Sequence, residues 1–269
     1  MQKETLIECP EEQKYGVCRL SLVPVYLSPD AGAGLLTQLL FGETYQVEGF
    51  TASKKWMKIS IPPYGLRGWM LKAQQQIISK EAFEDYNNGE YKVVTSPMST
   101  IEYKGNKIFL SPGSLLHIGT NELFEVEKHL KFHGESRPMR PVSSPEEIIS
   151  LARLFLNVPF LSGGRGFFGI GAGSFLQLVF RMAGYQIPKF ISEIIHVGKA
   201  VTLAEIEAGD VLIFGNNKDI PHHAGIYAGE NQVIHVHGMV RIDSLTRDEA
   251  GLYGNKPPIL NVLYVRRIR

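Results

Sequence analysis

Residues 162–174 read Ser-Gly-Gly-Arg-Gly-Phe-Phe-Gly-Ile-Gly-Ala-Gly-Ser and lead directly into a strongly apolar run. The run from Phe175 to Ala183 predicts a buried helix, and Gly184 supplies a common C-terminal stop. Glycine-rich loops before helices also bind phosphates, but here no Gly-Lys-Ser/Thr sequence closes the loop. No clear strand precedes the loop either, so a nucleotide site is not expected.

The segments on either side of this loop predict an α+β domain over residues 139–269. Upstream, Ser144-Pro145-Glu146-Glu147 has the pattern of a capping box with proline at the first helical position, and Pro159 ends the helix. Apolar residues follow at helical spacing, namely Ile148, Leu151, Leu154 and Phe155. Downstream, residues 210–214, 224–227, 233–237 and 261–265 read as strands. Helices followed by consecutive strands are typical of α+β folds.

The first half of the chain reads as two small β modules. Short apolar strands separated by Gly, Pro and Asp turns predict an all-β barrel over residues 14–76, with one strand expected over residues 39–47. A second β-rich stretch over residues 77–138 contains a hairpin signal at Gly105-Asn106. Residues 136–141 contain two prolines and read as a linker.

The composition excludes several classes of protein. The 269 residues carry a net charge of +1, so nothing favours a nucleic-acid or anionic-membrane partner. No apolar run approaches the ~20 residues that a membrane span needs. The first residues lack an apolar signal region, so we expect a cytoplasmic protein if the chain is full length and an envelope protein if a signal was removed. Cys9 and Cys18 are expected to be free thiols.

The order of residues around the loop fits a cysteine-peptidase site. Such a site needs a thiolate at a helix N-terminus, a histidine on a neighbouring strand and a polar group that orients the histidine. His223 opens one predicted strand and His235 lies on the next. This part of the chain resembles the NlpC/P60 cell-wall peptidases, which are papain-like. The shared segments are Gly163-Gly164, Phe168-Gly169-Ile170, Phe175, Ile187-Pro188, Gly209–Phe214, His223–Tyr227 and Ile234-His235.

The resemblance extends to the N-terminal half. Val23-Pro24-Val25, Leu39–Glu43 and Arg67–Met70 are similar to bacterial SH3 domains. The resemblance therefore implies two SH3-like barrels followed by a papain-like domain. This arrangement is similar to that of peptidases that cut between γ-D-glutamate and a diamino acid, and it implies no cofactor.

The chain departs from the family pattern at several functional positions. The family's Asp-Cys-Ser is Gly171-Ala172-Gly173 here, so the nucleophile position has no group that can attack a carbonyl. Phe190 stands where the family has an aspartate that holds the substrate amine. Ser162 replaces a family Trp, and Leu66-Arg67 replace a Tyr-Glu of the first SH3 module.

These departures together predict a pseudoenzyme whose His223 and His235 are relics. It would act as a binding module or scaffold for a peptide or cell-wall fragment unlike the family substrate, or for a protein partner. The alternatives are a hydrolase with altered chemistry in the same cleft and, last, a residual γ-D-glutamyl-diamino acid endopeptidase.

Two residue patterns could support a different hydrolytic chemistry, and each also has a simpler structural explanation. Ser174 could replace the thiol, but it lies two residues past that position, about 200° around the helix, and more simply caps the helix or packs inside the domain. His223, His235 and His237 could bind zinc, but spacing alone does not define a ligand set, and they are more simply two relics of the dyad and a hydrogen-bonded surface residue. Asp210 is expected to fix a turn, and residues 266–269 to form a solvated end.

Overall fold

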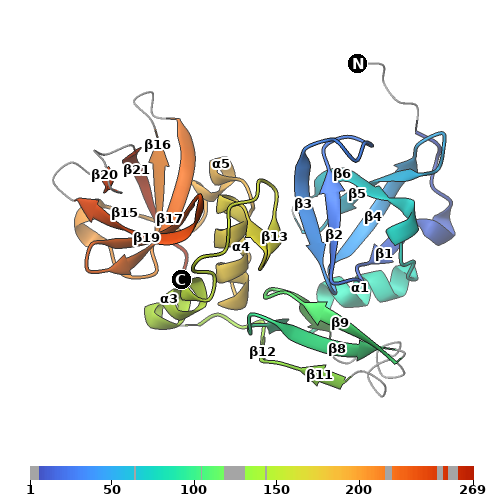
Figure 1. Ribbon diagram of the computed structural model, residues 1–269, viewed down its shortest axis with the longest axis horizontal. Helices are drawn as coiled ribbons and strands as arrows, with labels where there is room; N and C mark the ends of the chain where they lie inside the picture. The colour runs from blue at the N-terminus through green and yellow to red at the C-terminus, as the bar shows by residue number, and fades with distance from the viewer. Residues whose placement is uncertain are drawn as a thin grey trace. The chain divides into compact units, whose positions relative to one another are not determined.

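The computed structural model describes residues 6–63, 65–103, 105–117, 131–142, 144–215, 220–246, 251–253 and 260–269. The chain divides into two compact units, Met1–Pro138 and Met139–Arg269, and most of their elements are labelled in Figure 1. Residues 118–130 of the predicted second module and Lys104 of its hairpin lie outside the described residues. Among the described residues, no helix is both long and apolar enough to cross a membrane.

The N-terminal unit begins with a six-stranded antiparallel sheet in the order β1-β4-β5-β6-β2-β3. The strands are β1 Tyr15–Val17, β2 Leu22–Tyr26, β3 Leu35–Leu40, β4 Thr44–Phe50, β5 Trp56–Ile61 and β6 Leu66–Leu71. The strand predicted over residues 39–47 is wrong, because the chain turns between β3 and β4. Gly42 has φ +87°, and a Cβ there would lie 2.1 Å from the Leu115 carbonyl oxygen. The positive φ and the close approach both require glycine, and Gly42 lies in the turn between β3 and β4.

Over the described residues 79–103, 105–117 and 131–138, the rest of the N-terminal unit holds one helix and two three-stranded sheets, in the orders β10-β7-β12 and β11-β8-β9. Its elements are α1 Lys80–Asn88, β7 Tyr91–Val94, β8 Ser99–Tyr103, β9 Asn106–Leu110, β10 Leu115–His117, β11 Lys131–His133 and β12 Ser136–Pro138. The hairpin predicted at Gly105-Asn106 is confirmed, because β8 pairs with β9 across it.

Sequence reasoning missed helix α1. The helix is capped by Ser79, whose side chain accepts a hydrogen bond from the Ala82 N–H, and it buries only Ala82 and Tyr86. So narrow an apolar face gives a weak periodic signal.

Hydrogen bonds join the two predicted β modules within this unit. The Leu115 N–H donates to the Phe41 carbonyl at 2.8 Å. The His117 ring also binds the Gly42 carbonyl through Nε2 at 2.7 Å and stacks on Tyr86, with ring centroids 4.4 Å apart. The predicted module boundaries at residues 76 and 138 stay predictions, as does closure of either module into a barrel.

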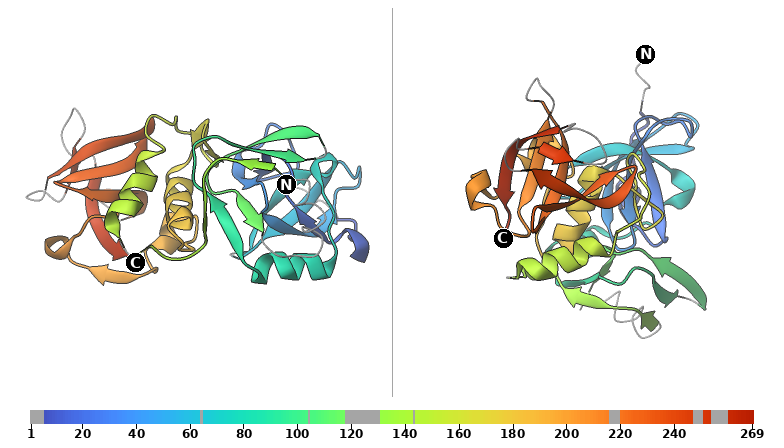
Figure 2. Two further views of the ribbon diagram at one scale, coloured as in Figure 1. Left: turned by 90° about the horizontal axis from the view of Figure 1, so that it is seen from below. Right: turned by 60° about the vertical axis from the view of Figure 1, so that its left-hand side comes forward.

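The C-terminal unit packs helices against a seven-stranded antiparallel sheet in the order β15-β21-β16-β17-β18-β19-β20. Its helices are α3 Pro145–Arg153, α4 Ala172–Met182 and α5 Ile191–Ile194, and β13 Arg165–Gly166 and β14 Gly169–Ile170 form a short hairpin. The sheet strands are β15 Lys199–Val201, β16 Val211–Gly215, β17 Pro221–Gly229, β18 Gln232–His237, β19 Met239–Thr246, β20 Gly251–Tyr253 and β21 Leu260–Arg267. All three helices contact β17, and Figure 2 shows α3 and α4 along one face of the sheet.

The N-terminus of α3 corrects one sequence prediction. Ser144 is the N-cap and Pro145 follows it, as expected, but no side chain caps the helix. The Ser144 hydroxyl instead donates to the Glu146 carboxylate. The capping box predicted here is therefore wrong, because the Ser144 hydroxyl bonds to the side chain of Glu146 and not to the helix backbone.

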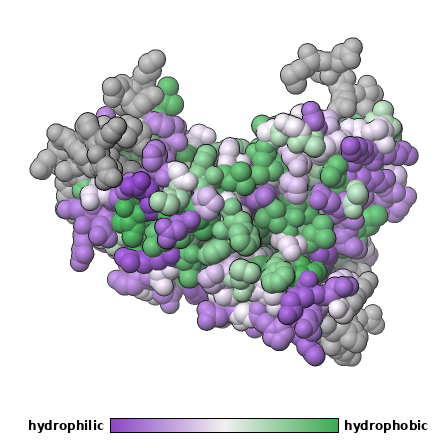
Figure 3. All heavy atoms as spheres, in the orientation of Figure 1, coloured by the Kyte–Doolittle hydropathy of each residue, from purple (hydrophilic) through white to green (hydrophobic). Residues whose placement is uncertain are grey.

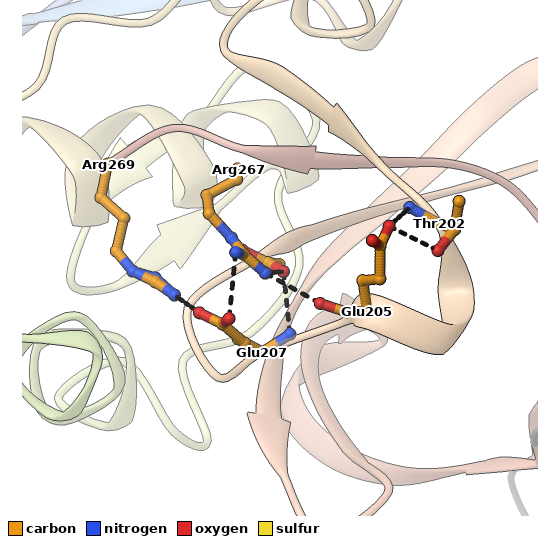
Figure 4. Close-up of polar contacts among 6 residues, drawn as sticks. Thr202, Glu205, Glu207, Arg267 and Arg269 are labelled. Atoms are coloured by element: carbon orange, nitrogen blue, oxygen red, sulfur yellow. Dashed lines mark hydrogen bonds and ion pairs between the residues drawn. The ribbon is translucent and has the colours of Figure 1, made fainter.

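The C-terminal residues are held by ion pairs, so the predicted solvated end is wrong (Figure 4). The guanidinium of Arg267 donates to both carboxylate oxygens of the fully buried Asp210, at 2.9 and 2.8 Å. Glu207 pairs with Arg267 at 3.0 Å and also with Arg269. Asp210 also accepts a hydrogen bond from the Glu207 N–H at 2.9 Å. It therefore fixes the turn before β16, as the sequence predicted.

Candidate functional site

The position that the family pattern gives to the nucleophile lies at the start of helix α4. Gly171 is the N-cap, Ala172 is the first helical residue, and no side chain caps the helix. The sequence placed this start between residues 173 and 175, one to three residues late, because the glycines at positions 171 and 173 give no helix signal. The first-turn N–H groups of a helix carry partial positive charge and would favour a thiolate. The half-buried methyl group of Ala172 offers nothing to activate.

The glycine-rich loop brings the chain tightly onto this helix start. The Gly171 N–H donates to the Gly164 carbonyl at 3.0 Å, and the Leu161 N–H donates to the Ile170 carbonyl at 3.1 Å. A Cβ on Gly164 would lie only 2.5 Å from the Gly169 carbonyl oxygen. The loop therefore needs glycine for close packing and for the β13–β14 hairpin. Phosphate binding is not needed to explain why the loop is rich in glycine. Ser162, the predicted Trp replacement, is exposed at its beginning.

Residues 188–190, which the sequence resemblance predicts to replace the amine-binding segment, lie against the first turn of α4. A Cβ on Gly173 would lie 2.0 Å from the carbonyl oxygen of Lys189, so no side chain fits there without a backbone shift. The Lys189 ammonium lies 5.7 Å from the ring centroid of Phe190, which is 40% exposed. This part of the site presents a cation and an aromatic ring where an amine-binding site needs an acid.

His223 on β17 and His235 on β18 form a buried pair. The distance between His223 Nε2 and His235 Nδ1 is 2.8 Å, and the two side chains are 9% and 2% exposed. The strand register places His235 opposite Gly225, two residues beyond His223 on the same face. A Cβ on Gly225 would lie 2.9 Å from the His235 Cβ. The bare glycine therefore gives the imidazole of His235 the room to reach His223 diagonally.

Asp243 on β19 completes this chain of hydrogen bonds. Its Oδ2 lies 2.9 Å from His235 Nε2, and its Oδ1 accepts from Arg241 Nε and Nη2 at 2.9 and 2.6 Å. Sequence reasoning missed both residues. The available signal was their spacing. Arg241 and Asp243 are two residues apart on β19, so they face the same side of the sheet, and β19 follows the strand that holds His235 and His237. That signal needs the strand register, which the sequence alone did not supply.

The hydrogen-bond chain fixes where the protons sit. The Asp243 carboxylate only accepts, so His235 Nε2 carries the proton and its Nδ1 accepts. His223 Nε2 must then donate to His235, which leaves the lone pair on His223 Nδ1. Burial, followed by the charges of His235, His237 and His222, lowers the pKa of His223 to about 3. Burial also lowers the pKa of His235. The pair is therefore neutral at pH 7 and presents a base at His223 Nδ1.

The geometry does not favour the two alternative chemistries. Ser174 lies inside α4 with 1% of its surface exposed, and its Oγ has no hydrogen-bond partner, so the predicted capping role is wrong. Both ring nitrogens of His235 are already engaged, and exposed His237 only stacks beside it at 6.4 Å between ring centroids. Across the described part of the chain, no group of three or more His, Cys, Asp or Glu is arranged to hold a metal ion.

Leu66 and Arg67 lie in the N-terminal unit, at the start of β6. Leu66 packs against the core of the first sheet, and Arg67 pairs with Glu48 at 2.7 Å. Figure 3 shows hydrophilic and hydrophobic side chains interspersed on the drawn face of each unit. Among the exposed large hydrophobic residues are Phe160, at 52% exposed, and Phe168, at 81%. Both belong to the glycine-rich region beside α4.

Comparisons with known proteins agree on one family. The model of the NlpC/P60 family matches residues 157–251. A gamma-D-glutamyl-L-lysine dipeptidyl-peptidase of Bacillus subtilis (strain 168) is 30% identical over 227 residues, covering 74% of this chain and 71% of the relative. A protein of the same name from Bacillus cereus (strain ATCC 10987 / NRS 248) is 23% identical over 229 residues, covering 75% of this chain and 67% of the relative.

Solved structures show the same fold. An NlpC/P60 family protein from Bacillus cereus ATCC 10987 superposes with a TM-score of 0.73 at 18% identity, covering 94% of this chain and 99% of that one. An NlpC/P60 endopeptidase from Photobacterium damselae subsp. piscicida superposes with a TM-score of 0.66 at 14% identity. That match covers 89% of this chain and 68% of the other.

Proposed function

The chain belongs to the NlpC/P60 family, and we propose that it is a member that has lost the peptidase reaction and kept a peptide-binding site. The ligand in this proposal is a cell-wall peptide that differs from the family substrate near its amine. The N-terminal sheets act with the C-terminal unit as a binding module or scaffold.

The identity of Ala172 carries the proposal. A cysteine peptidase forms a covalent bond between a thiolate and the substrate carbonyl, and this step cannot occur at a methyl group. The surviving part of the machinery supports the same view. His223 and His235 still form a neutral hydrogen-bonded pair supported by Asp243, so a base remains without a nucleophile to activate.

The change at Phe190 supports a changed ligand. The two curated Bacillus relatives act on gamma-D-glutamyl-L-lysine by name, and the family pattern puts an aspartate for the substrate amine at this position. An ammonium group beside Phe190 would lose a charge-assisted contact worth about 1.5–3 kcal/mol. It would also face the cation of Lys189, and we infer that the ligand of this chain carries no free amine there.

We further propose that residues 14–76 and 77–138 are SH3-like modules. The six-stranded order of the first sheet and the two small sheets that follow support this. In the family pattern the first module offers Tyr-Glu to the substrate, whereas here Leu66 and Arg67 occupy those positions. Arg67 is engaged by Glu48, which is consistent with the loss of the original contact.

The test combines binding and cleavage of a defined peptide. L-Alanyl-γ-D-glutamyl-L-lysine, with its N-terminal amine either free or acetylated, is titrated into the full chain by calorimetry. Each mixture is then analysed by mass spectrometry, with His223→Ala as the matched variant. We expect the acetylated peptide to bind more tightly and both peptides to be recovered intact. Cleavage that disappears in His223→Ala, or failure of both peptides to bind, would refute the proposal.

A further inference from the structure

Four large apolar side chains are exposed at one corner of the C-terminal unit. They belong to Phe160, Leu161, Phe168 and Met239, which are between 41% and 81% exposed, and we call this surface the apolar corner. Exposed apolar side chains that gather on one part of a domain often mark a surface that binds a ligand or a partner. The apolar corner is therefore a candidate binding surface.

Phe168 is held in solvent by the β13–β14 hairpin. Gly166 pairs with Gly169, so Phe167 and Phe168 form the turn between the two strands. The ring centroids of Phe167 and buried Phe155 are 6.1 Å apart, which anchors the turn on the core. A ring presented from such a turn loses little conformational freedom when a ligand packs on it.

Backbone contacts bring the other three side chains next to this hairpin. The Phe160 N–H donates to the carbonyl of Gly238, the residue before Met239, at 2.8 Å. A Cβ on Gly169, within the hairpin, would lie 2.8 Å from the Leu161 Cβ. The exposed side chains of the apolar corner therefore come from three adjoining segments.

The apolar corner carries almost no exposed charge. Among residues 157–171 and 236–240, which form it, Arg165 is the only Asp, Glu, Lys or Arg, and it is only 3% exposed. An anionic polymer or membrane would require exposed cations, so the corner suits an uncharged ligand. A sugar ring meets this requirement, because one of its faces presents C–H groups that pack on the negative face of an aromatic ring.

The segment Lys189–Phe190 disfavours a free amine in the ligand. Burial, followed by the charge of Arg165, lowers the pKa of Lys189 to about 8, so its ammonium is still mostly charged at pH 7. Phe190 offers no carboxylate, and a ligand ammonium here would bring two cations together. An acyl group on the ligand amine removes that charge and needs a place of its own on the protein.

The apolar corner and this segment flank the same helix start. The Leu161 carbonyl oxygen lies 3.4 Å from the point that a Cβ of Gly171 would occupy, and the Lys189 carbonyl oxygen lies 2.0 Å from the corresponding point on Gly173. Because residues 171 and 173 are at most about 7 Å apart along the chain, the two oxygens lie within about 16 Å of each other. One ligand that joins a peptide to a sugar spans both places.

From the uncharged apolar corner and its distance from Lys189, we propose that the ligand is a muropeptide, a wall peptide whose N-terminal amine is still acylated by its sugar. The sugar ring packs on Phe160 and Phe168 while the peptide lies along the start of α4. This inference rests on the proposed function and names the class of ligand. The family pattern, in which an acid holds a free amine, selects the opposite class.

The experiment compares three groups on the amine of one peptide. L-Alanyl-γ-D-glutamyl-L-lysine carrying an N-acetylmuramyl, an acetyl or a hexanoyl group is titrated into the full chain by calorimetry. Phe168→Ala and Phe168→Leu are measured beside wild type, and Phe109→Ala, at an exposed phenylalanine of β9, is the matched control. Each mixture is checked for cleavage by mass spectrometry, and light scattering gives the molar mass of each free protein.

We expect the muramyl peptide to bind wild type about fivefold to tenfold more tightly than the acetyl and hexanoyl peptides. Both Phe168 variants should lose this preference, because leucine keeps apolar surface but has no ring, and Phe109→Ala should keep it. Equal binding of the muramyl and acetyl peptides, or a preference that survives Phe168→Ala, would overturn the inference and leave the proposed function intact.

Other results would assign the apolar corner to a different occupant. Binding of the hexanoyl peptide as tightly as the muramyl peptide would show that the corner takes an acyl chain. A wild-type dimer that Phe168→Ala dissociates would show that it takes a second copy, and either result overturns the sugar. Failure of all three peptides to bind, or their cleavage, would instead refute the proposed function on which the inference rests.

Discussion

Replacing Ala172 by cysteine separates the two requirements of a cysteine peptidase, an activated thiol and a bound substrate. The helix N-terminus should lower the pKa of the new thiol, because it stabilises a negative charge by about 0.3–2 kcal/mol. One pKa unit corresponds to about 1.36 kcal/mol, so the helix alone lowers the thiol pKa by about 0.2–1.5 units. Lys189 and Arg165 act in the same direction. We therefore expect the pKa to fall from about 8.5 to below about 7.5.

Substrate cleavage should nevertheless stay poor in this variant. In the proposed function Phe190 takes the place of the carboxylate that binds the substrate amine, and a lost contact of about 1.5–3 kcal/mol corresponds to about 10–150-fold in kcat/KM. The cations beside the site repel the same amine, so the deficit should reach at least about 100-fold. The comparison is with the Bacillus subtilis relative acting on the same peptide.

The assay measures both properties on one sample. The rate of alkylation by iodoacetamide is followed against pH, and cleavage of L-alanyl-γ-D-glutamyl-L-lysine is followed by mass spectrometry. Wild-type protein gives the background rate of alkylation from its two native thiols. This rate should be low, because Cys18 is buried and burial raises the pKa of Cys9. A fast-reacting thiol without efficient cleavage is expected. Cleavage within tenfold of the relative would refute the reasoning that substrate contacts were lost together with the nucleophile.

Three further predictions concern the structure that supports the site. Gly173→Ser should lower the free energy of unfolding by about 2 kcal/mol or more in urea denaturation, since its Cβ would lie 2.0 Å from the Lys189 carbonyl oxygen. Arg267→Met should cost about 3–5 kcal/mol in the same measurement, because it leaves the fully buried Asp210 carboxylate without its partner. Burial lowers the pKa of His117 to about 4, so the unfolded chain binds more protons between about pH 4 and 6.5. Stability should therefore fall as the pH drops through that window, and His117→Gln should flatten the slope.

Each of these predictions has a matched control. Gly171→Asp should be neutral or stabilising, because nothing crowds its Cβ and aspartate is a preferred N-cap. The exposed Lys199 and His133 provide controls for Arg267 and His117 through Lys199→Met and His133→Gln. An unfolding free energy within about 0.5 kcal/mol of wild type for Gly173→Ser or Arg267→Met would contradict the packing and ion-pair arguments. An unchanged pH slope in His117→Gln would contradict the third.

Sequence patterns were informative where one segment determines its own structure. The apolar residues after Phe175 and the motif His223–Tyr227 identify α4 and β17, because their composition and length suffice. The start of α4 was misplaced because Gly171 caps it without a side chain that would signal a cap. The family resemblance was likewise readable, since it depends on residue order alone, whereas the assignment of Ala172 to the nucleophile position stays a prediction.

Contacts between distant segments were out of reach of the sequence. Asp243 joins the His223–His235 pair only through the register of β18 and β19, which the turn at Gly238 sets. Arg267 reaches Asp210, 57 residues earlier, only because β21 lies beside β16. No local pattern distinguishes such an arginine from one in a solvated terminus.

The most direct test of the central claim is mass spectrometry of a mixed muropeptide digest incubated with the purified chain and, in parallel, with His223→Ala. We expect wild type to leave every peptide of the digest unchanged, because Ala172 cannot attack a carbonyl. Cleavage products that appear with wild type and vanish with His223→Ala would show that the site still performs chemistry, and they would contradict the loss of the peptidase reaction.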